Sequence, residues 1–215
     1  TKTVAVGYGA LETQNLTTNI DTYNVAMGYN AGRDITTGIQ NTIIGGLAGD
    51  ALQDADNNVA IGRSALSADT FGSAAVAIGY AALANQNFST ANSNYNIGIG
   101  FEAGKQVTTG TQNVFIGGFA GDANTTGTNN TYIGYGAATA DDQSQQNVVV
   151  GAQAATLMNH GSEVGFTTIV GFQAGYYNVT GTSNTFVGYR AGFGVSTNSN
   201  ANNVGIGRES LYSVT

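Results

Sequence analysis

The chain is dominated by a glycine that returns at nearly fixed spacing from one end to the other. Each of twelve such glycines follows Val, Ile or Met, and Ala stands three residues after eleven of them. These anchor glycines are Gly7, Gly28, Gly45, Gly62, Gly79, Gly100, Gly117, Gly134, Gly151, Gly171, Gly188 and Gly207. Most gaps are 17 residues, and the others are 19 to 21. A fixed period of this kind predicts a solenoid, in which each coil contacts mainly its sequence neighbours.

The coils are grouped in a longer period. Gly7, Gly79 and Gly151 lie 72 residues apart, and so do Gly28 and Gly100. We therefore expect a single array over residues 1–215, with three supercells of four coils at about 1–72, 73–144 and 145–215. Because the chain starts within the repeat pattern and has no initiator Met, we expect it to be a segment of a longer fibrous protein.

The amino-acid composition favours a solenoid of stacked β-strands. Charged residues make up 9% of the chain, against about 25% in ordinary globular proteins. Sparse charge suits stacked strands, because like charges piled in register would repel at every rung. Proline, which cannot donate to a strand ladder, is absent. The fold class that we expect is all-β, a parallel β-solenoid of about twelve coils of 17–21 residues.

Charge, hydropathy and cysteine content argue against several kinds of binding partner and site. The net charge is −7 and the six basic residues are spread along the chain, so we expect no nucleic-acid surface. No apolar run has transmembrane length, so we expect no membrane insertion by this segment. Because cysteine is absent, there is no disulfide framework and no thiolate metal site. We expect no cofactor.

The residues before each anchor glycine read as a strand. Counting from the anchor, position −1 is Val, Ile or Met and position −3 is Val, Ile or Thr in every coil. Such β-branched side chains fit a pleated surface, and residues two apart on a strand face the same side. We expect these two columns to face the interior of the coil.

Position −2 would then face outward. It is Ala or Gly in half of the coils and large in the rest, at Ile43, Phe115, Tyr132, Val149, Ile169 and Phe186. A row of such groups in water would form an apolar patch, which usually marks an interaction surface. Since a coil of 17 residues encloses only a thin core, association of identical copies would add buried area. We predict a homotrimer with these six residues at its interface.

Two further columns belong to the repeat core. Asn stands at position −4 in nine coils, where it suits either a hydrogen-bonded ladder or a turn at the start of the strand. The Ala column at position +3 indicates a place with no room for a γ-carbon, and the anchor glycine predicts a positive φ or a bend. We expect the structural core to include Gly28, Gly45, Gly100, Gly117, Gly188, Asn41, Asn113 and Asn184.

Several coils resemble a known family. The segments NVAIGRSA from Asn58, AVAIGYAA from Ala75 and NTFVGYRAG from Asn184 are similar to the head repeats of trimeric autotransporter adhesins and to related phage tail-fibre repeats. This resemblance implies a left-handed parallel β-roll, with three rolls joined lengthwise. It also implies a rigid, adhesive or spacing role, extracellular at a cell surface or on a virion, with a surface glycan or protein as receptor. We expect receptor contacts in the irregular return segments 85–95, 158–166 and 194–202.

Enzymatic chemistry has few candidates. Tailspikes that degrade polysaccharide use a carboxylate pair across a groove, and the candidate pairs are Asp54 with Asp56 and Asp141 with Asp142. The interpretation that we favour is solvated return-loop acids that limit sideways aggregation. His160 is the only histidine and lies in the turn-like MNHGSE, so we expect an exposed loop residue. We therefore expect no metal site, no catalytic triad and no enzyme.

An ice-binding face is a further hypothesis, suggested by the threonine pairs Thr36-Thr37 and Thr108-Thr109. A flat ice-binding face needs such threonines at every coil, whereas these pairs recur once per supercell. The function that the sequence favours is therefore a structural or adhesive segment of a trimeric surface or tail fibre.

Overall fold

A computed structural model describes residues 2–15, 21–194 and 200–213 of the chain. Every regular element in these ranges is a β-strand, and the strands fall into two compact units, Thr1–Thr109 and Gly110–Thr215. Within each unit the long strands pair in parallel with their sequence neighbours. The prediction of an all-β chain that forms a parallel β-solenoid is therefore confirmed.

Unit 1 contains one short strand in each coil. These strands are β1 (Val4–Val6), β2 (Val25–Met27), β3 (Thr42–Ile44), β4 (Val59–Ile61), β6 (Val76–Ile78) and β8 (Ile97–Ile99). They pair in that order and in exact coil register, so that Ile43 lies between Ala26 and Ala60. A second, two-stranded ladder of β5 (Gly72–Ser73) and β7 (Asn92–Ser93) lies on the return side.

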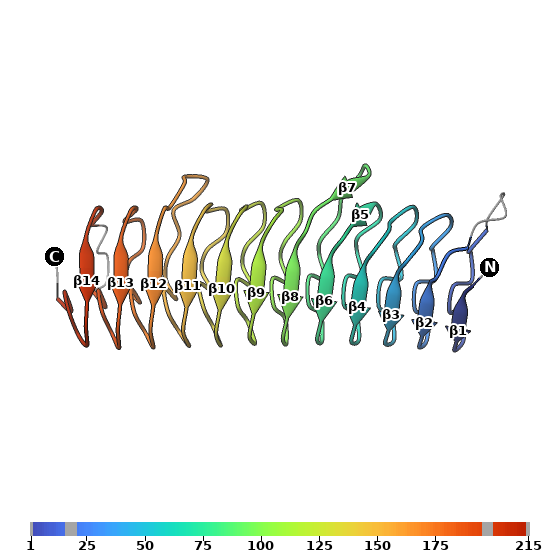
Figure 1. The fold of residues 1–215 in the computed structure, drawn as a ribbon, viewed down its shortest axis with the longest axis horizontal. Helices are drawn as coiled ribbons and strands as arrows, with labels where there is room; N and C mark the ends of the chain where they lie inside the picture. Colours follow the sequence, from blue (N-terminus) through green and yellow to red (C-terminus); the bar gives the residue numbers. More distant parts are fainter. Residues whose placement is uncertain (1, 16–20, 195–199, 214–215) are drawn as a thin grey trace. The chain divides into compact units, whose positions relative to one another are not determined.

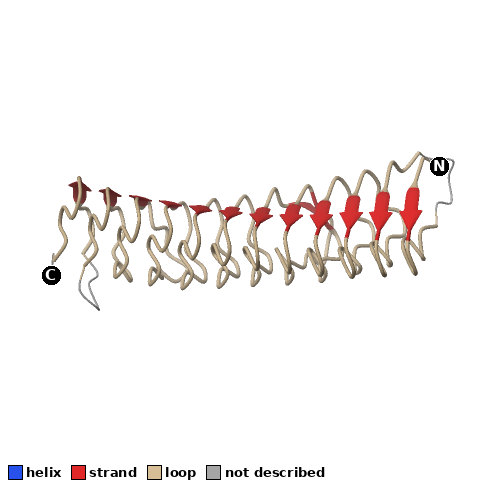
Figure 2. Cartoon of the chain, turned by 90° about the horizontal axis from the view of Figure 1, so that it is seen from below, coloured by secondary structure: helices blue, strands red, loops and turns tan. Residues whose placement is uncertain are grey.

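Unit 2 repeats the same arrangement. Its strands are β9 (Val114–Ile116), β10 (Thr131–Ile133), β11 (Val148–Val150), β12 (Thr168–Val170), β13 (Thr185–Val187) and β14 (Val204–Ile206). All neighbours pair in parallel at equal coil positions. In each unit the strands lie side by side, and the return loops lie on the other side of the coil (Figures 1 and 2). The predicted division into three supercells stays a prediction.

At the anchor glycines the backbones of successive coils approach closely. Their φ angles run from 116° to 141°, so the predicted positive φ is confirmed. A Cβ atom built on Gly45 would lie 2.6 Å from the carbonyl oxygen of Gly62, the anchor of the following coil. Gly28, Gly117 and Gly188 meet the next anchor in the same way. No side chain fits here, because the obstacle is backbone and cannot rotate away.

The Asn column closes each coil and joins it to the next. Asn41 Nδ2 donates to the carbonyl of Ala55 at 2.7 Å, near the end of the same coil. Its Oδ1 accepts from the backbone N–H of Asn58, in the following coil, at 2.9 Å. The same donation to a carbonyl occurs at Asn24, Asn58, Asn113, Asn130 and Asn184. The column thus combines the ladder and the turn that the sequence left open, and these buried amides are satisfied.

The interior and exterior of the strands are opposite to the prediction. Position −2, expected outside, is buried: Ile43, Phe115, Tyr132, Val149 and Ile169 are 0% exposed and Phe186 is 6% exposed. Positions −3 and −1, expected inside, are half-buried or exposed, with Met27 at 47% and Val148 at 40%. The predicted trimer interface is therefore wrong, because side chains inside their own coil cannot contact another chain.

A second column explains why position −2 points inward. Each of the six large residues at −2 is matched by Gly or Ala at position +4. At Gly121 an added Cβ would lie 2.5 Å from the ring of Phe115, so the glycine makes room for that ring. Conversely, Ala60 is matched by Leu66, and both are fully buried. Positions −2 and +4 therefore share one interior volume, as expected of a close-packed core.

The anchor contact predicts a sharp difference between two adjacent glycines. Gly45→Ala should lower the free energy of unfolding by at least about 3 kcal/mol, because its Cβ meets the Gly62 carbonyl at a disfavoured φ. Gly46→Ala is the matched control, since the nearest atom to its Cβ is 4.0 Å away, and it should cost less than about 0.5 kcal/mol. Urea unfolding followed by circular dichroism measures both. Equal losses would contradict the contact.

Candidate functional site: the outward strand face

The most extended candidate site is the outer side of the strands. We call the residues at positions −3 and −1 the strand face. In unit 1 they are Val4, Val6, Val25, Met27, Thr42, Ile44, Val59, Ile61, Val76, Ile78, Ile97 and Ile99. In unit 2 they are Val114, Ile116, Thr131, Ile133, Val148, Val150, Thr168, Val170, Thr185, Val187, Val204 and Ile206.

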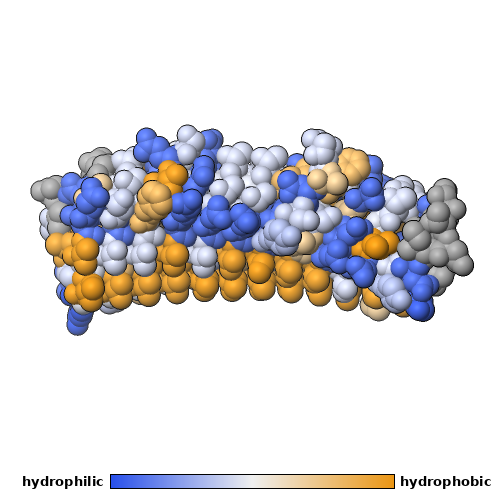
Figure 3. Space-filling model, turned by 45° about the horizontal axis from the view of Figure 1, so that its top comes forward, coloured by the Kyte–Doolittle hydropathy of each residue, from blue (hydrophilic) through white to orange (hydrophobic). Residues whose placement is uncertain are grey.

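The strand face carries no charge and little polarity. Apart from four threonines, every residue in it is Val, Ile or Met. Figure 3 shows hydrophobic side chains gathered along the lower border of the view, where the strands are seen obliquely. Single apolar residues on a surface are ordinary, but contiguous rows of them mark interaction surfaces.

Aromatic side chains at position +1 border the strand face. The exposed rings are Tyr8, Tyr29, Tyr80, Phe101, Tyr135, Phe172 and Tyr189. Where consecutive coils both carry a ring, the rings stack: centroids lie 5.7 Å apart for Tyr8–Tyr29 and 5.8 Å apart for Phe172–Tyr189. Tyrosines with exposed faces and a polar end suit a surface that is partly covered and partly wet.

No charged residue stands at positions −3 or −1. Arg63 and Arg208 stand at position +1 beside the face, and three other basic side chains pair with nearby carboxylates. Lys2 Nζ is 2.9 Å from Asp21, Arg33 Nε is 2.7 Å from Asp34, and Lys105 Nζ is 3.0 Å from Glu102. Such exposed pairs contribute little to stability. Their place matters more, because it leaves the strand face without a charged group that association would have to desolvate.

Three of the four acids in the proposed carboxylate pairs are hydrogen-bonded to a neighbouring coil or buried. Asp54 accepts from Thr37 Oγ1 at 2.8 Å, and Asp56 accepts from the N–H of Ile39 at 2.8 Å, so both bond the preceding coil. Asp141, predicted as a solvated acid, is 0% exposed instead. A carboxylate inside its own coil cannot reach a polysaccharide.

Asp141 is the centre of a buried polar cluster in unit 2. Its Oδ2 accepts from Tyr132 Oη at 2.5 Å and from Asn124 Nδ2 at 3.3 Å, and its Oδ1 accepts from Ser144 Oγ. Burial raises the pKa of Asp141, while the hydrogen bonds from Ser144 and Tyr132 act in the opposite direction. In unit 1 the corresponding Asp69 accepts from Gln86 Nε2 at 2.6 Å, and burial raises its pKa too.

His160 is buried and not in an exposed loop, so that prediction is wrong. Its backbone N–H donates to Ser144 Oγ at 3.1 Å in the preceding coil, and its Nε2 lies 3.0 Å from the carbonyl of Gly181 in the following one. Burial lowers the pKa of the imidazole. The ring therefore fills space between successive coils. No cluster of three or more metal-ligating side chains occurs among the residues that the structure describes.

One of the remaining predicted sites is only partly described. Residues 195–199 of the expected receptor segment 194–202 lie outside the described residues. In the first threonine pair, Thr37 is exposed, but the following coil carries Asp54 at the same position, so no continuous threonine face forms there. Among the described residues there is also no helix long and apolar enough to span a membrane.

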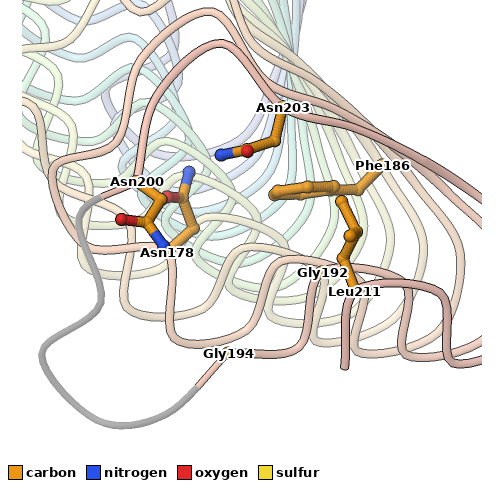
Figure 4. Close-up of a pocket in the computed structure, with 7 residues that line it drawn as sticks. All are labelled: Asn178, Phe186, Gly192, Gly194, Asn200, Asn203 and Leu211. Atoms are coloured by element: carbon orange, nitrogen blue, oxygen red, sulfur yellow. The ribbon is translucent and has the colours of Figure 1, made fainter. Parts of the chain in front are cut away.

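A small cavity lies inside the last coils of unit 2. In Figure 4, Asn178 and Asn200 lie on one side of this space and Phe186 and Leu211 on the other. Its volume of about 10 Å³ holds at most about one water molecule. The cavity is thus a packing feature of the coil end and not a ligand site.

Comparison of the chain with models of known protein families, with curated proteins and with solved structures gave no match. The likeness to adhesin and tail-fibre repeats therefore remains a likeness of sequence pattern. The strand face is the candidate surface that the sequence analysis placed in the interior of the coil. The signal that identifies it is that every large side chain at position −2 is matched by Gly or Ala at position +4, which marks both columns as interior.

The buried carboxyl predicts a pH-dependent stability difference. Because the folded-state pKa of Asp141 is raised, its contribution is complete below the unfolded-state pKa and is lost as pH rises through the folded-state pKa. Asp141→Asn places an amide where Asn124 and Asn178 already stand in other coils. The free energy of unfolding of this variant, relative to wild type, should therefore rise as pH increases above 3.8.

Urea unfolding of both proteins across a pH series measures this difference. The reciprocal variant Asn178→Asp buries a second carboxyl at the same coil position and should change stability in the opposite sense as pH rises. A wild-type minus Asp141→Asn difference that does not vary with pH would contradict the buried position of this carboxyl.

Proposed function

We propose that this chain is a structural and adhesive segment of a homotrimeric fibre, on a cell surface or a phage tail, and that the strand face is where its copies meet. The observation that carries the proposal is the uncharged surface on the outer side of the strands in each unit, which consists of Val, Ile and Met with four threonines. The rigid shaft role follows from coils that are bonded to each other at every rung.

An identical copy suits the strand face better than an unrelated partner does. The face is a regular series of β-branched ridges, repeated at the strand spacing of about 4.8 Å. A second copy carries the same ridges at the same spacing, so that contacts made at one rung recur at the next. Closed association of identical chains is also the usual way in which such faces are covered. The number three comes from the resemblance to trimeric adhesin heads.

A position outside the cell or on the virion fits the same proposal. An adhesive segment meets its receptor there, and the receptor that we propose is a surface glycan or protein. The proposed chemistry is binding and spacing, since Asp54 and Asp56 hydrogen-bond the preceding coil and Asp141, one member of the second pair, is in the coil interior.

Light scattering after size-exclusion chromatography tests the assembly. The wild-type chain at micromolar concentration should have three times the mass of one chain. Ile61→Glu places a charge on the strand face, and burying it unpaired should cost on the order of 3 kcal/mol per chain, so the variant should dissociate. Gln40→Glu, which adds the same charge at an exposed return-side residue, is the matched control and should stay trimeric.

Two results would contradict the proposal. One is a wild-type chain that remains a single chain at these concentrations. The other is an Ile61→Glu variant that associates as well as Gln40→Glu does, because the contact would then lie elsewhere. Circular dichroism of each variant distinguishes dissociation from unfolding.

A further inference from the structure

A pocket of about 250 Å³ opens beside the turns that follow the anchor glycines of β9, β10 and β11 in unit 2. Its lining residues come from equivalent positions of three successive coils. They are Phe119, Gly136 and Gln153 at position +2, Asp122, Thr139 and Thr156 at position +5, and Tyr135 at position +1. The pocket lies outside the two columns of the strand face.

One missing side chain creates the hollow. The coils on either side carry Phe119 and Gln153 where the middle coil has Gly136. A Cβ on Gly136 would meet only Thr139 Cγ2 at 3.7 Å and Gln153 Cγ at 4.0 Å, which is ordinary contact. Its φ of 63° is shared by Phe119 at 59° and Gln153 at 54°. The backbone therefore does not require glycine here, and what the glycine provides is the space.

One wall of the pocket is aromatic. The rings of Phe119 and Tyr135 meet edge to face, with centroids 5.9 Å apart and an interplanar angle of 88°. Tyr135 is 60% exposed, so part of its surface is open to a ligand. This aromatic wall offers an apolar surface against which a ligand ring with C–H groups on one face can pack. The tyrosine hydroxyl adds a polar group at the end of the wall.

The opposite wall offers hydrogen-bonding groups that are held in place. Thr139 Oγ1 donates to the carbonyl of Thr156 at 3.2 Å, and Thr156 Oγ1 donates to the carbonyl of Gln153 at 2.9 Å. Their hydrogens are thus used, and their lone pairs remain as acceptors. Gln153 Oε1 accepts from Gln173 Nε2 at 2.9 Å, which orients the amide and leaves Gln153 Nε2 as a donor. The carboxyl group of Asp122 also lines the pocket.

We infer that this pocket binds one ring of a neutral saccharide. A sugar ring has an apolar C–H face for the aromatic wall and several hydroxyl groups for the acceptors and the amide donor. The volume is slightly below the ~300–1,000 Å³ of drug-sized sites, which suits a single ring. Neither Lys nor Arg lines the pocket and a carboxylate does, so acidic sugars and phosphates are disfavoured. A quaternary ammonium would use the ring and the carboxylate but not the hydroxyl and amide groups.

This inference deepens the adhesive part of the proposed function and does not require the trimer. Saturation-transfer NMR of the full chain would test glucose, galactose, mannose and N-acetylglucosamine, with sialyllactose and choline as charged comparisons. At least one neutral sugar should bind, and calorimetry with that sugar should give its affinity. Tighter binding of choline or sialyllactose would overturn the assignment, and so would the absence of binding by every neutral sugar.

Two variants connect binding to the pocket. Gly136→Gln should fill it and lower the affinity at least tenfold, that is by about 1.4 kcal/mol or more, and the fold should persist because Gln153 has the same φ region in the next coil. Tyr135→Ala removes the open ring and should have an effect of similar size. Tyr189→Ala is the matched control, since it removes an exposed ring at the same coil position outside the pocket.

Sugar binding that survives both Gly136→Gln and Tyr135→Ala would overturn the inference. If either variant fails to fold, as judged by circular dichroism, the other one decides. A trimer that binds no sugar would remove this inference and leave the fibre proposal standing. A chain that stays monomeric and binds sugar through Tyr135 would contradict the proposed trimer and support the sugar pocket.

Discussion

The whole architecture depends on the close approach of backbone to backbone at the anchor glycines. At Gly45 the space for a Cβ is occupied by the carbonyl of Gly62, and the same contact recurs between the anchors of successive coils within each unit. Because that contact is between main-chain atoms, it holds the coils in one register whatever the surrounding side chains are. The Asn column strengthens this register, since each buried amide bonds both its own coil and the next. Short strands of three residues suffice because they are only one part of this network.

Once the register of the coils is fixed, the volume inside each coil determines which side chains can occupy its interior positions. The space inside is shared by positions −2 and +4, which explains the pairs Phe115 with Gly121 and Ala60 with Leu66. At position +7 the buried carboxyls of Asp141 and Asp69 accept hydrogen bonds from other interior side chains. The side chains at positions −3 and −1 are then left outside. Their uncharged, regular surface is the physical basis for the proposed self-association, and a single omitted side chain at Gly136 is the basis for the proposed sugar pocket.

The sequence predicted the features of this structure that depend on the repeat period and on backbone conformation. The coil length, the parallel strands and the positive φ of the anchor all follow from where glycine, Asn and β-branched residues recur. The sequence did not predict which side of each strand faces the interior, because alternation of residue types distinguishes the two sides without identifying the buried one. Val and Ile at −3 and −1 look like core residues, and Ile43 or Phe186 at −2 looks like the exception. The burial of His160 and the pocket at Gly136 depend on contacts between successive coils, which no single coil reveals.

The central claim is that Ile43 and its equivalents are inside while Ile44 and its equivalents are outside. Because the chain has no cysteine, a single thiol reports directly on each position. Ile43→Cys and Ile44→Cys would be labelled with a maleimide in dilute solution, where light scattering detects single chains. We expect the thiol at position 44 to react readily and the thiol at position 43 to react only after unfolding. Ready labelling at position 43 with protection at position 44 would contradict this account.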